Sequence, residues 1–195
     1  MNNQTKQQVK HYKLRALCEG AIMVAAAQIL SYLKFYEMPY GGSVTLGMIP
    51  LIFYAIRWGV GPGLLASFVY SALQLLLDGG YAYTWQSMLL DYLLAYTVLG
   101  MAGVFRGKRW GVFAGTVLAS VLRFAVHTLA GVYVWAEYMP EYFLGLKMGS
   151  PWIYSPLYNS IYVALNMILC LAAFGVMYRP LKRYILGEDI RSQAK

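Results

Sequence analysis

Long apolar segments are the feature of this sequence that most limits its fold. A helix that crosses a membrane needs about 20 mainly apolar residues. Six candidate segments meet or approach this length, at residues 15–36, 43–58, 61–77, 86–105, 111–135 and 152–178. The second and third are short, and Pro50 interrupts the second. The sequence therefore predicts an all-α membrane protein, a bundle of six transmembrane helices that forms a single integral membrane domain over residues 1–195.

The composition agrees with a protein whose surface is covered by lipid. Apolar residues make up 59% of the chain and charged residues only 12%, whereas about 25% of a soluble domain is charged. The formal net charge of +8 would, in a soluble protein, suggest binding to nucleic acid. The positions of the basic residues favour another explanation, and no nucleic-acid partner is expected.

The basic residues indicate the orientation of the chain in the membrane. Cytoplasmic segments of membrane proteins carry an excess of Lys and Arg. If the N-terminus is cytoplasmic, six spans place most of the basic residues inside: Lys6, Lys10, Lys13, Arg15, Arg57, Arg106, Lys108, Arg109, Arg179, Lys182, Arg183, Arg191 and Lys195. Only Lys34 and Lys147 lie in outer loops, and Arg123 lies within a span. We therefore expect both termini to be cytoplasmic, in a multi-pass protein of the bacterial cell membrane.

Common enzyme motifs are missing from the sequence. It has no GxxxxGK[ST] phosphate loop, no HExxH pair and no GxSxG turn. Cys18 and Cys170 lie far apart in apolar segments and are expected to be two reduced thiols. We expect a binding subunit of a transporter, with no catalytic residues, metal site, resident cofactor or ATPase motif of its own.

Ionisable residues inside the spans are the first candidates for a binding site, because a charge in the membrane is costly and usually faces a cavity or a partner. Asp91 lies in the fourth span. In the fifth span, His127, Gly131 and Trp135 recur every four residues, so they share one helical face. At Gly131, either a ligand or a neighbouring helix could approach the backbone.

The sixth span adds polar and aromatic residues at the same depth. Asn159, Tyr162 and Asn166 share one face, and Tyr154 lies five residues before Asn159, close to a helix irregularity expected at Pro156. A carboxylate, an imidazole, an amide and aromatic rings suit a planar organic cation, because aromatic faces attract cations. Hydrogen bonds between helices with no ligand remain the structural alternative. Arg123, one turn before His127, receives no ligand role.

Five sequence pieces, in this order, resemble the thiamine-specific substrate-binding (S) components of energy-coupling factor (ECF) vitamin transporters, the ThiT family. They are LCEGAIMVAAA, GGSVTLGMIPLIFYAIRWG, LLDYLLAYTVLGMAGVFRG, LRFAVHTLAGVYVWAEY and YSPLYNSIYVALN, and the resemblance extends from about residue 14 to residue 180. It implies a six-helix bundle that binds thiamine with high affinity.

The resemblance also implies which residues surround the ligand. In the family, an acid and an asparagine bond the aminopyrimidine, a tryptophan stacks on a ring, and the acid helps to neutralise the thiazolium. The matching residues here are Asp91, Tyr92, His127, Gly131, Trp135, Tyr154 and Asn159. Tyr83 or Tyr81 could supply a tyrosine from the loop before the fourth span. Where some relatives place a tryptophan over the thiazolium, this chain has Gly41 and Gly42, with Tyr40 as the nearest substitute.

The partners implied by the resemblance are a transmembrane coupling (T) subunit and two ATPase subunits. Ala21 and Ala25 match the small residues on which the family docks the coupling subunit, although packing within the bundle is an alternative. No cluster of Arg or Lys lies among the outer candidates, which favours free thiamine over its phosphates. The other functions considered are an S component for another vitamin or for a thiamine precursor with the same pyrimidine, and an intramembrane enzyme that uses Asp91 and His127.

Overall fold

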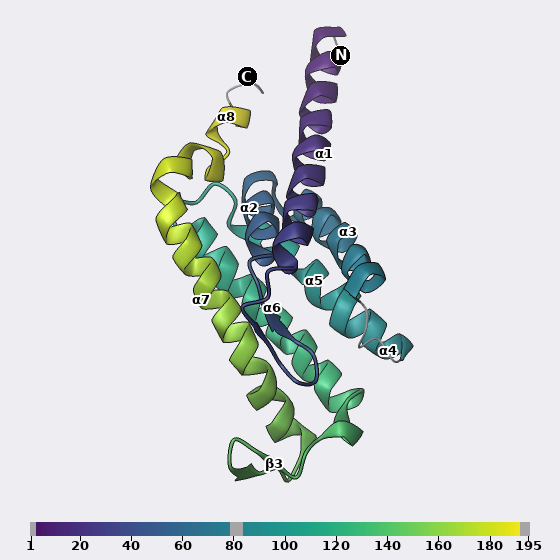
Figure 1. Ribbon diagram of the computed structural model, residues 1–195. Helices are drawn as coiled ribbons and strands as arrows, with labels where there is room; N and C mark the ends of the chain where they lie inside the picture. Colours follow the sequence, from purple (N-terminus) through teal and green to yellow (C-terminus); the bar gives the residue numbers. More distant parts are fainter. Residues whose placement is uncertain (1–2, 79–83, 192–195) are drawn as a thin grey trace.

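The computed structural model describes residues 3–78 and 84–191, and helices make up most of them (Figure 1). The long helices are α1 (Asn3–Ser31), α3 (Val60–Asp78), α6 (Gly111–Tyr133) and α7 (Pro151–Ile185). A further helical segment runs through α4 (Trp85–Ser87), η1 (Met88–Leu94), α5 (Ala95–Thr97) and η2 (Val98–Phe105). Short helices are α2 (Met48–Trp58), η3 (Ala136–Tyr138) and α8 (Glu188–Arg191).

Two small antiparallel hairpins complete the described part of the chain. Strands β1 (Tyr36–Glu37) and β2 (Ser43–Val44) pair in the connection between α1 and α2. Strands β3 (Tyr142–Phe143) and β4 (Leu146–Lys147) pair in the connection between η3 and α7. The β3–β4 hairpin lies at the end of the bundle opposite the two chain ends (Figure 1).

Five of the six predicted spans are helices long and apolar enough to cross a membrane: Lys10–Ser31, Val60–Leu77, Trp85–Phe105, Gly111–Tyr133 and Pro151–Ile190. The prediction for residues 43–58 is wrong in extent, since Ser43 and Val44 form a strand and the helix begins only at Met48. At 1.5 Å per residue, α2 is about 16 Å long. It is too short to cross the roughly 30 Å apolar layer.

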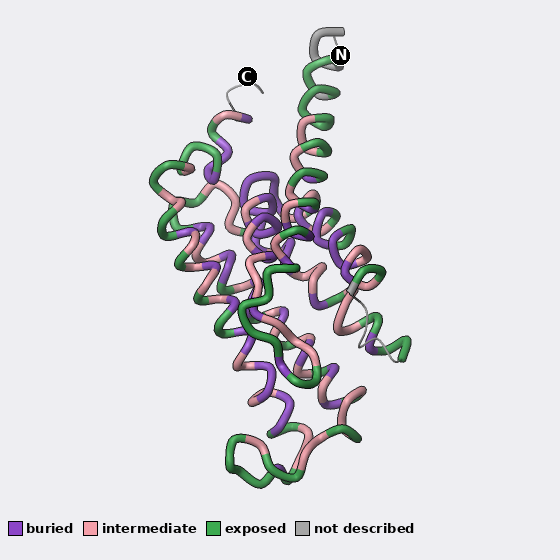
Figure 2. Tube along the Cα trace, viewed as in Figure 1, coloured by how far each residue is buried: buried purple, intermediate pink, exposed green. Residues whose placement is uncertain are grey.

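Helix α2 is instead the centre of the core. Its Leu51, Ile52, Ala55 and Ile56 are fully buried, and it packs against α1, α3, η2, α6 and α7. Most of α2 is buried in Figure 2, whereas the N-terminal half of α1 is largely exposed. An apolar helix surrounded by other helices needs no contact with lipid, so its length is not set by the membrane.

The helix ends near α8 are joined by a network of ion pairs around Arg57, whose side chain is only 3% exposed. Its Nε donates to Glu19 Oε2 (2.7 Å) and its Nη1 to Asp189 Oδ1 (2.6 Å). Trp58 Nε1 also donates to Glu19 (2.7 Å), and Arg15 pairs with both carboxylates. A buried charge is tolerated when it is paired and hydrogen-bonded, so this network connects α1, α2 and α8.

The first and last described helices, α1 and α8, lie at the same end of the bundle (Figure 1). With five membrane-length helices, both ends can lie on one side of the membrane only if α2 and the chain on either side of it together make a sixth crossing. That this end is cytoplasmic stays a prediction.

Glycines allow α3 and η2 to cross with their backbones in contact. A Cβ carbon built on Gly100 would lie 2.3 Å from the backbone nitrogen of Leu64 and 2.4 Å from the carbonyl carbon of Gly63. On Gly103 it would lie 2.6 Å from the backbone nitrogen of Val60. Small residues permit such close approach of helices in membranes, where packing is a main source of helix association.

We predict that Gly100→Ala destabilises the fold, because the added methyl group meets the backbone of α3 and not a flexible side chain. The expected cost is about 1–3 kcal/mol, as for other overpacked sites. It would lower the midpoint of thermal unfolding in detergent. The matched control is Gly61→Ala, since a Cβ carbon there would have no described atom within 4 Å apart from its chain neighbours and its own helix backbone. Equal losses of stability in the two variants would contradict this account of the crossing.

Candidate substrate-binding site

A cavity of about 370 Å³ lies between η1, α5, α6, α7 and the connection that contains β1 and β2. This volume is within the range of small-molecule sites, about 300–1,000 Å³. The cavity wall contains every described residue predicted to surround the ligand: Tyr40, Asp91, Tyr92, His127, Gly131, Trp135, Tyr154 and Asn159. Tyr81 and Tyr83 lie outside the described residues. The structure thus brings together residues from four separate regions of the sequence.

Asp91 lies in η1, a π-helical turn that follows the capped start of α4. Thr84 and Ser87 form a reciprocal capping box there. Turns of this kind interrupt regular helices and are frequent at functional sites. The Asp91 carboxylate accepts hydrogen bonds from Trp135 Nε1 at Oδ2 (2.7 Å) and from His127 Nδ1 at Oδ1 (3.0 Å). The side chain keeps 20% exposure, so the anion is oriented by two donors and still borders the cavity.

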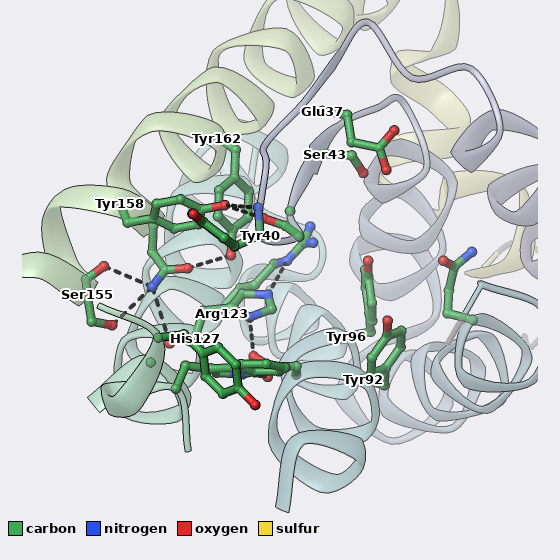
Figure 3. Close-up of a pocket in the computed structure, with 18 of the residues that line it drawn as sticks. Glu37, Tyr40, Ser43, Tyr92, Tyr96, Arg123, His127, Ser155, Tyr158 and Tyr162 are labelled. Atoms are coloured by element: carbon green, nitrogen blue, oxygen red, sulfur yellow. Dashed lines mark hydrogen bonds and ion pairs between the residues drawn. The ribbon is translucent and has the colours of Figure 1, made fainter. Parts of the chain in front are cut away.

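His127 is hydrogen-bonded on both sides of its ring. Besides the bond to Asp91, its Nε2 is 3.3 Å from Nε of Arg123, one helical turn earlier in α6. The guanidinium carbon of Arg123 lies 4.5 Å from the ring centre of Tyr96, a distance at which a cation is attracted to an aromatic face. Arg123 and His127 lie between Tyr158 and Tyr162 on one side and Tyr92 and Tyr96 on the other (Figure 3). Arg123 had not been predicted to take part in the site, although its spacing from His127 places it on the same face of α6.

Asn159 is buried and already hydrogen-bonded by its neighbours. Its Nδ2 donates to the carbonyl oxygens of Ser155 (2.9 Å) and His127 (3.3 Å), and its Oδ1 accepts from the hydroxyl of Tyr162 (2.7 Å). The bond to His127 joins α7 to α6, as expected of an interhelical contact with no ligand involved, whereas the bonds to Ser155 and Tyr162 lie within α7. A ligand that bonds Asn159 must therefore share or replace one of them.

At Gly131, α6 lies so close to the side chain of Ser155 on α7 that no room is left for a methyl group. A Cβ carbon there would lie 2.1 Å from Oγ of Ser155, which donates to the carbonyl oxygen of Thr128 (2.8 Å). The structure shows close packing of a neighbouring helix at Gly131, which also lines the cavity, so approach of a ligand there stays a prediction. This contact also sets how far Asn159 and His127 are apart across the helix pair.

The connection between β1 and β2 covers one side of the cavity and depends on two glycines. Gly41 and Gly42 have φ angles of +90° and +92°, a backbone conformation that residues other than glycine rarely adopt. A Cβ carbon on Gly42 would also lie 2.7 Å from the ring of Tyr162. Tyr158 holds the turn, because its hydroxyl accepts from the backbone N–H of Tyr40 (3.0 Å) and donates to the carbonyl oxygen of Gly41 (2.9 Å). No large side chain could replace these glycines, and Tyr40 remains the aromatic residue at this edge.

The cavity wall also contains two basic side chains, where the sequence indicated no basic cluster. Lys34 pairs with Glu37 (3.0 Å), and Arg123 donates to His127. Other cavity residues that the sequence had not assigned to the ligand are Gln74, Tyr96, Tyr138, Ser155, Tyr158 and Tyr162. Within residues 3–78 and 84–191, no group of three or more His, Cys, Asp or Glu residues could hold a metal ion. The described cavity wall therefore offers the carboxylate of Asp91 within a membrane-spanning segment, together with ring faces and hydrogen-bonding groups.

Ala21 and Ala25 are not part of this cavity. Both are exposed on α1, on the side where Ile22 (62% exposed) and Ile29 (67%) also face outward. The alternative that these alanines serve packing inside the bundle is therefore wrong. They form a narrow apolar strip that another helix could approach closely.

Comparison with known proteins places this architecture in a defined group. The model of a family described as Thiamine transporter protein (Thia_YuaJ) matches residues 17–186. The thiamine transporter ThiT of Bacillus subtilis is 32% identical over 95% of this chain and 98% of its own length. The thiamine transporter ThiT of Lacticaseibacillus paracasei is 27% identical over 94% and 96%.

The fold has a counterpart among solved structures. The structure of ThiT from Listeria monocytogenes superposes with a TM-score of 0.78 at 21% identity, covering 89% of this chain and 98% of that chain. Together with the five membrane-length helices, these similarities establish a multi-pass protein of the cell membrane. The chain belongs to the Thiamine transporter protein (Thia_YuaJ) family.

Proposed function

We propose that this protein is a high-affinity thiamine-binding S component of an ECF-type vitamin transporter. It captures thiamine from outside the cell and passes it inward in a complex with a transmembrane coupling subunit and two ATPase subunits. The names of the relatives support thiamine as the ligand and favour transport over the intramembrane enzyme considered from the sequence.

The observation that carries this proposal is the oriented Asp91 carboxylate at a cavity wall rich in aromatic rings. Thiamine combines a flat aminopyrimidine, whose amino group can donate to a carboxylate, with a positively charged thiazolium. Capture from dilute solution needs nanomolar affinity, which corresponds to about 12 kcal/mol. Ring contacts, attraction of a cation to aromatic faces at about 0.5–2 kcal/mol each, and a charge pair away from bulk water supply interactions of the required kind.

Release inside requires a second conformation that binds thiamine more weakly, because a transporter must lose its ligand where it delivers it. The exposed strip at Ala21 and Ala25 is suited to contact the coupling subunit, since small residues let helices approach closely. The chain continues from α1 into the β1–β2 connection that covers the cavity. A partner bound on α1 would therefore act on the helix that leads directly to this cover.

A thiamine precursor with the same pyrimidine, or another vitamin, is the second candidate ligand. A precursor that lacks the thiazolium would keep the hydrogen bonds of the aminopyrimidine and lose the attraction between the cation and Asp91. Binding of charged and neutral ligands to the same variants separates these possibilities.

We predict that Asp91→Asn weakens thiamine binding roughly hundredfold, which corresponds to about 2.7 kcal/mol. The reason is that the amide keeps the shape of the carboxylate and loses its charge. A neutral pyrimidine analogue should lose much less. The measurement is isothermal titration calorimetry of purified protein in detergent, with quenching of tryptophan fluorescence as a second signal.

Glu137→Gln serves as the matched control, because Glu137 is exposed and does not line the cavity. It should leave thiamine binding unchanged. Equal losses for thiamine and the neutral analogue in Asp91→Asn would contradict a role of the charge. Absence of both heat and quenching with the unaltered protein would exclude thiamine as the ligand.

A second prediction concerns the strip on α1. Ala21→Leu combined with Ala25→Leu should abolish thiamine uptake by cells or proteoliposomes that contain the whole complex, because the larger side chains keep the coupling subunit at a distance. Thiamine binding to the isolated protein should be unchanged. Ala172→Leu, at an exposed alanine of α7, is the control and should support normal uptake. Normal uptake by the double variant would refute this docking site.

A further inference from the structure

Arg123 is the buried cation that the proposed binding of thiamine does not use. It is 5% exposed, lies in a membrane-spanning helix, and faces a cavity proposed to bind a ligand of the same charge. An arginine in this position repels a cationic ligand, so its presence calls for a separate explanation. Its hydrogen bond to His127 provides this explanation.

The direction of this hydrogen bond is fixed by chemistry. The guanidinium has five N–H donors and no acceptor, and it is not deprotonated in proteins. Because Nε of Arg123 lies 3.3 Å from Nε2 of His127, the imidazole must offer a lone pair at Nε2. A neutral imidazole with an acceptor at Nε2 carries its proton at Nδ1. That proton points to Oδ1 of Asp91, 3.0 Å away.

The arrangement is therefore a directed chain of hydrogen bonds from Arg123 through His127 to Asp91, which Trp135 completes from the other side. In this chain His127 is neutral and Asp91 keeps its full negative charge. A doubly protonated imidazole would direct an Nε2–H at the N–H of Arg123 and place two cations in contact. It would also pair with Asp91 and cancel the charge that a cationic ligand needs.

We propose that Arg123 is a positioning residue that keeps His127 in the neutral Nδ1-protonated form and so reserves the Asp91 anion for the ligand. The consequence for binding rests on the function proposed above, whereas the state of His127 can be measured without any ligand. Arg123 thus affects binding of the cationic ligand indirectly, through His127 and Asp91.

Other described groups of the cavity wall contact partners other than Nε2 of His127. From α7, the ring of Tyr162 lies edge-on at 5.7 Å from the imidazole, and its hydroxyl donates to Asn159. From α5, Tyr96 lies against the guanidinium. The remaining charged groups of the cavity wall, Lys34 and Glu37, pair with each other. In the described part of the wall, Arg123 is the group that bonds Nε2.

The first test is the pH dependence of thiamine affinity between pH 8 and pH 6. The unaltered protein should vary by no more than about twofold, because His127 stays neutral. In Arg123→Met, protonation of His127 at the lower pH cancels the charge of Asp91. Since one linked proton changes an affinity by at most tenfold per pH unit, we expect a loss of about tenfold or more over this range.

Three variants assign the effect to this chain of residues. Arg123→Lys keeps a cationic donor and should restore the flat profile. Arg123→Met combined with His127→Gln has no imidazole in the cavity and should lose the pH dependence. His11→Gln removes an exposed histidine of α1 and should change nothing. A flat profile in Arg123→Met, or a steep one in the double variant, would overturn the proposal.

The second test needs no ligand. With His11 replaced by Gln, His127 is the single remaining histidine of the sequence. Solid-state NMR of ¹⁵N-histidine in liposomes at pH 6 should then show one protonated nitrogen, Nδ1, and one unprotonated nitrogen, Nε2. Arg123→Met should show two protonated nitrogens. A proton on Nε2 with Arg123 in place would overturn the proposal even if the variant does not fold.

The two tests separate this inference from the proposed function. If the unaltered protein shows the Nδ1-protonated ring, the Arg123→Met ring is doubly protonated, and thiamine does not bind, then the positioning role stands and thiamine is the wrong ligand. If thiamine binds and the ring is protonated at Nε2, the proposed function stands and the role of Arg123 is refuted.

Discussion

The carboxylate of Asp91 inside a membrane-spanning segment is the constraint on which the site depends. A charge in this position is costly unless it is paired or hydrogen-bonded. Two donors from α6 and the residues just after it, His127 and Trp135, supply those bonds and leave the carboxylate at the cavity wall. The π-helical turn of η1 presents the carboxylate, and the close α6–α7 contact at Gly131 holds the opposite wall.

The charged groups near α8 and those in the cavity are paired in different ways. Near α8, Arg57 is surrounded by Glu19, Asp189 and a backbone carbonyl, so its charge is neutralised within the fold. In the cavity, Arg123 bonds His127 and not Asp91, so an imidazole, neutral in our proposal, separates this cation from the carboxylate. The first arrangement connects helices, whereas the second keeps an anion available to a cation from outside.

The fold class and most of the site could be predicted from the sequence. Apolar length alone identifies the long helices, and steps of four residues bring His127 and Gly131 to one face. Residue type and depth connect them with Asp91 and Asn159, which the structure places in the same cavity wall. These features are local or periodic, so a single sequence contains them.

What the sequence could not provide depends on contacts between distant residues. The burial of α2 among five other elements could not be read from its own composition. The pairing of Arg57 with Asp189 joins residues 132 positions apart. The packing role of Gly131 depends on Ser155, and Asn159 donates one of its hydrogen bonds to the carbonyl oxygen of His127 on α6. Arg123 is the exception, since its spacing from His127 already indicated a shared face.

The most direct test of the central claim is a crystal structure of this protein with thiamine bound. The account predicts thiamine in the cavity with its aminopyrimidine hydrogen-bonded to Asp91 and a ring against Trp135. The Arg123–His127–Asp91 chain of hydrogen bonds should be intact. Thiamine outside this cavity, or within it and not in contact with Asp91, would contradict the account.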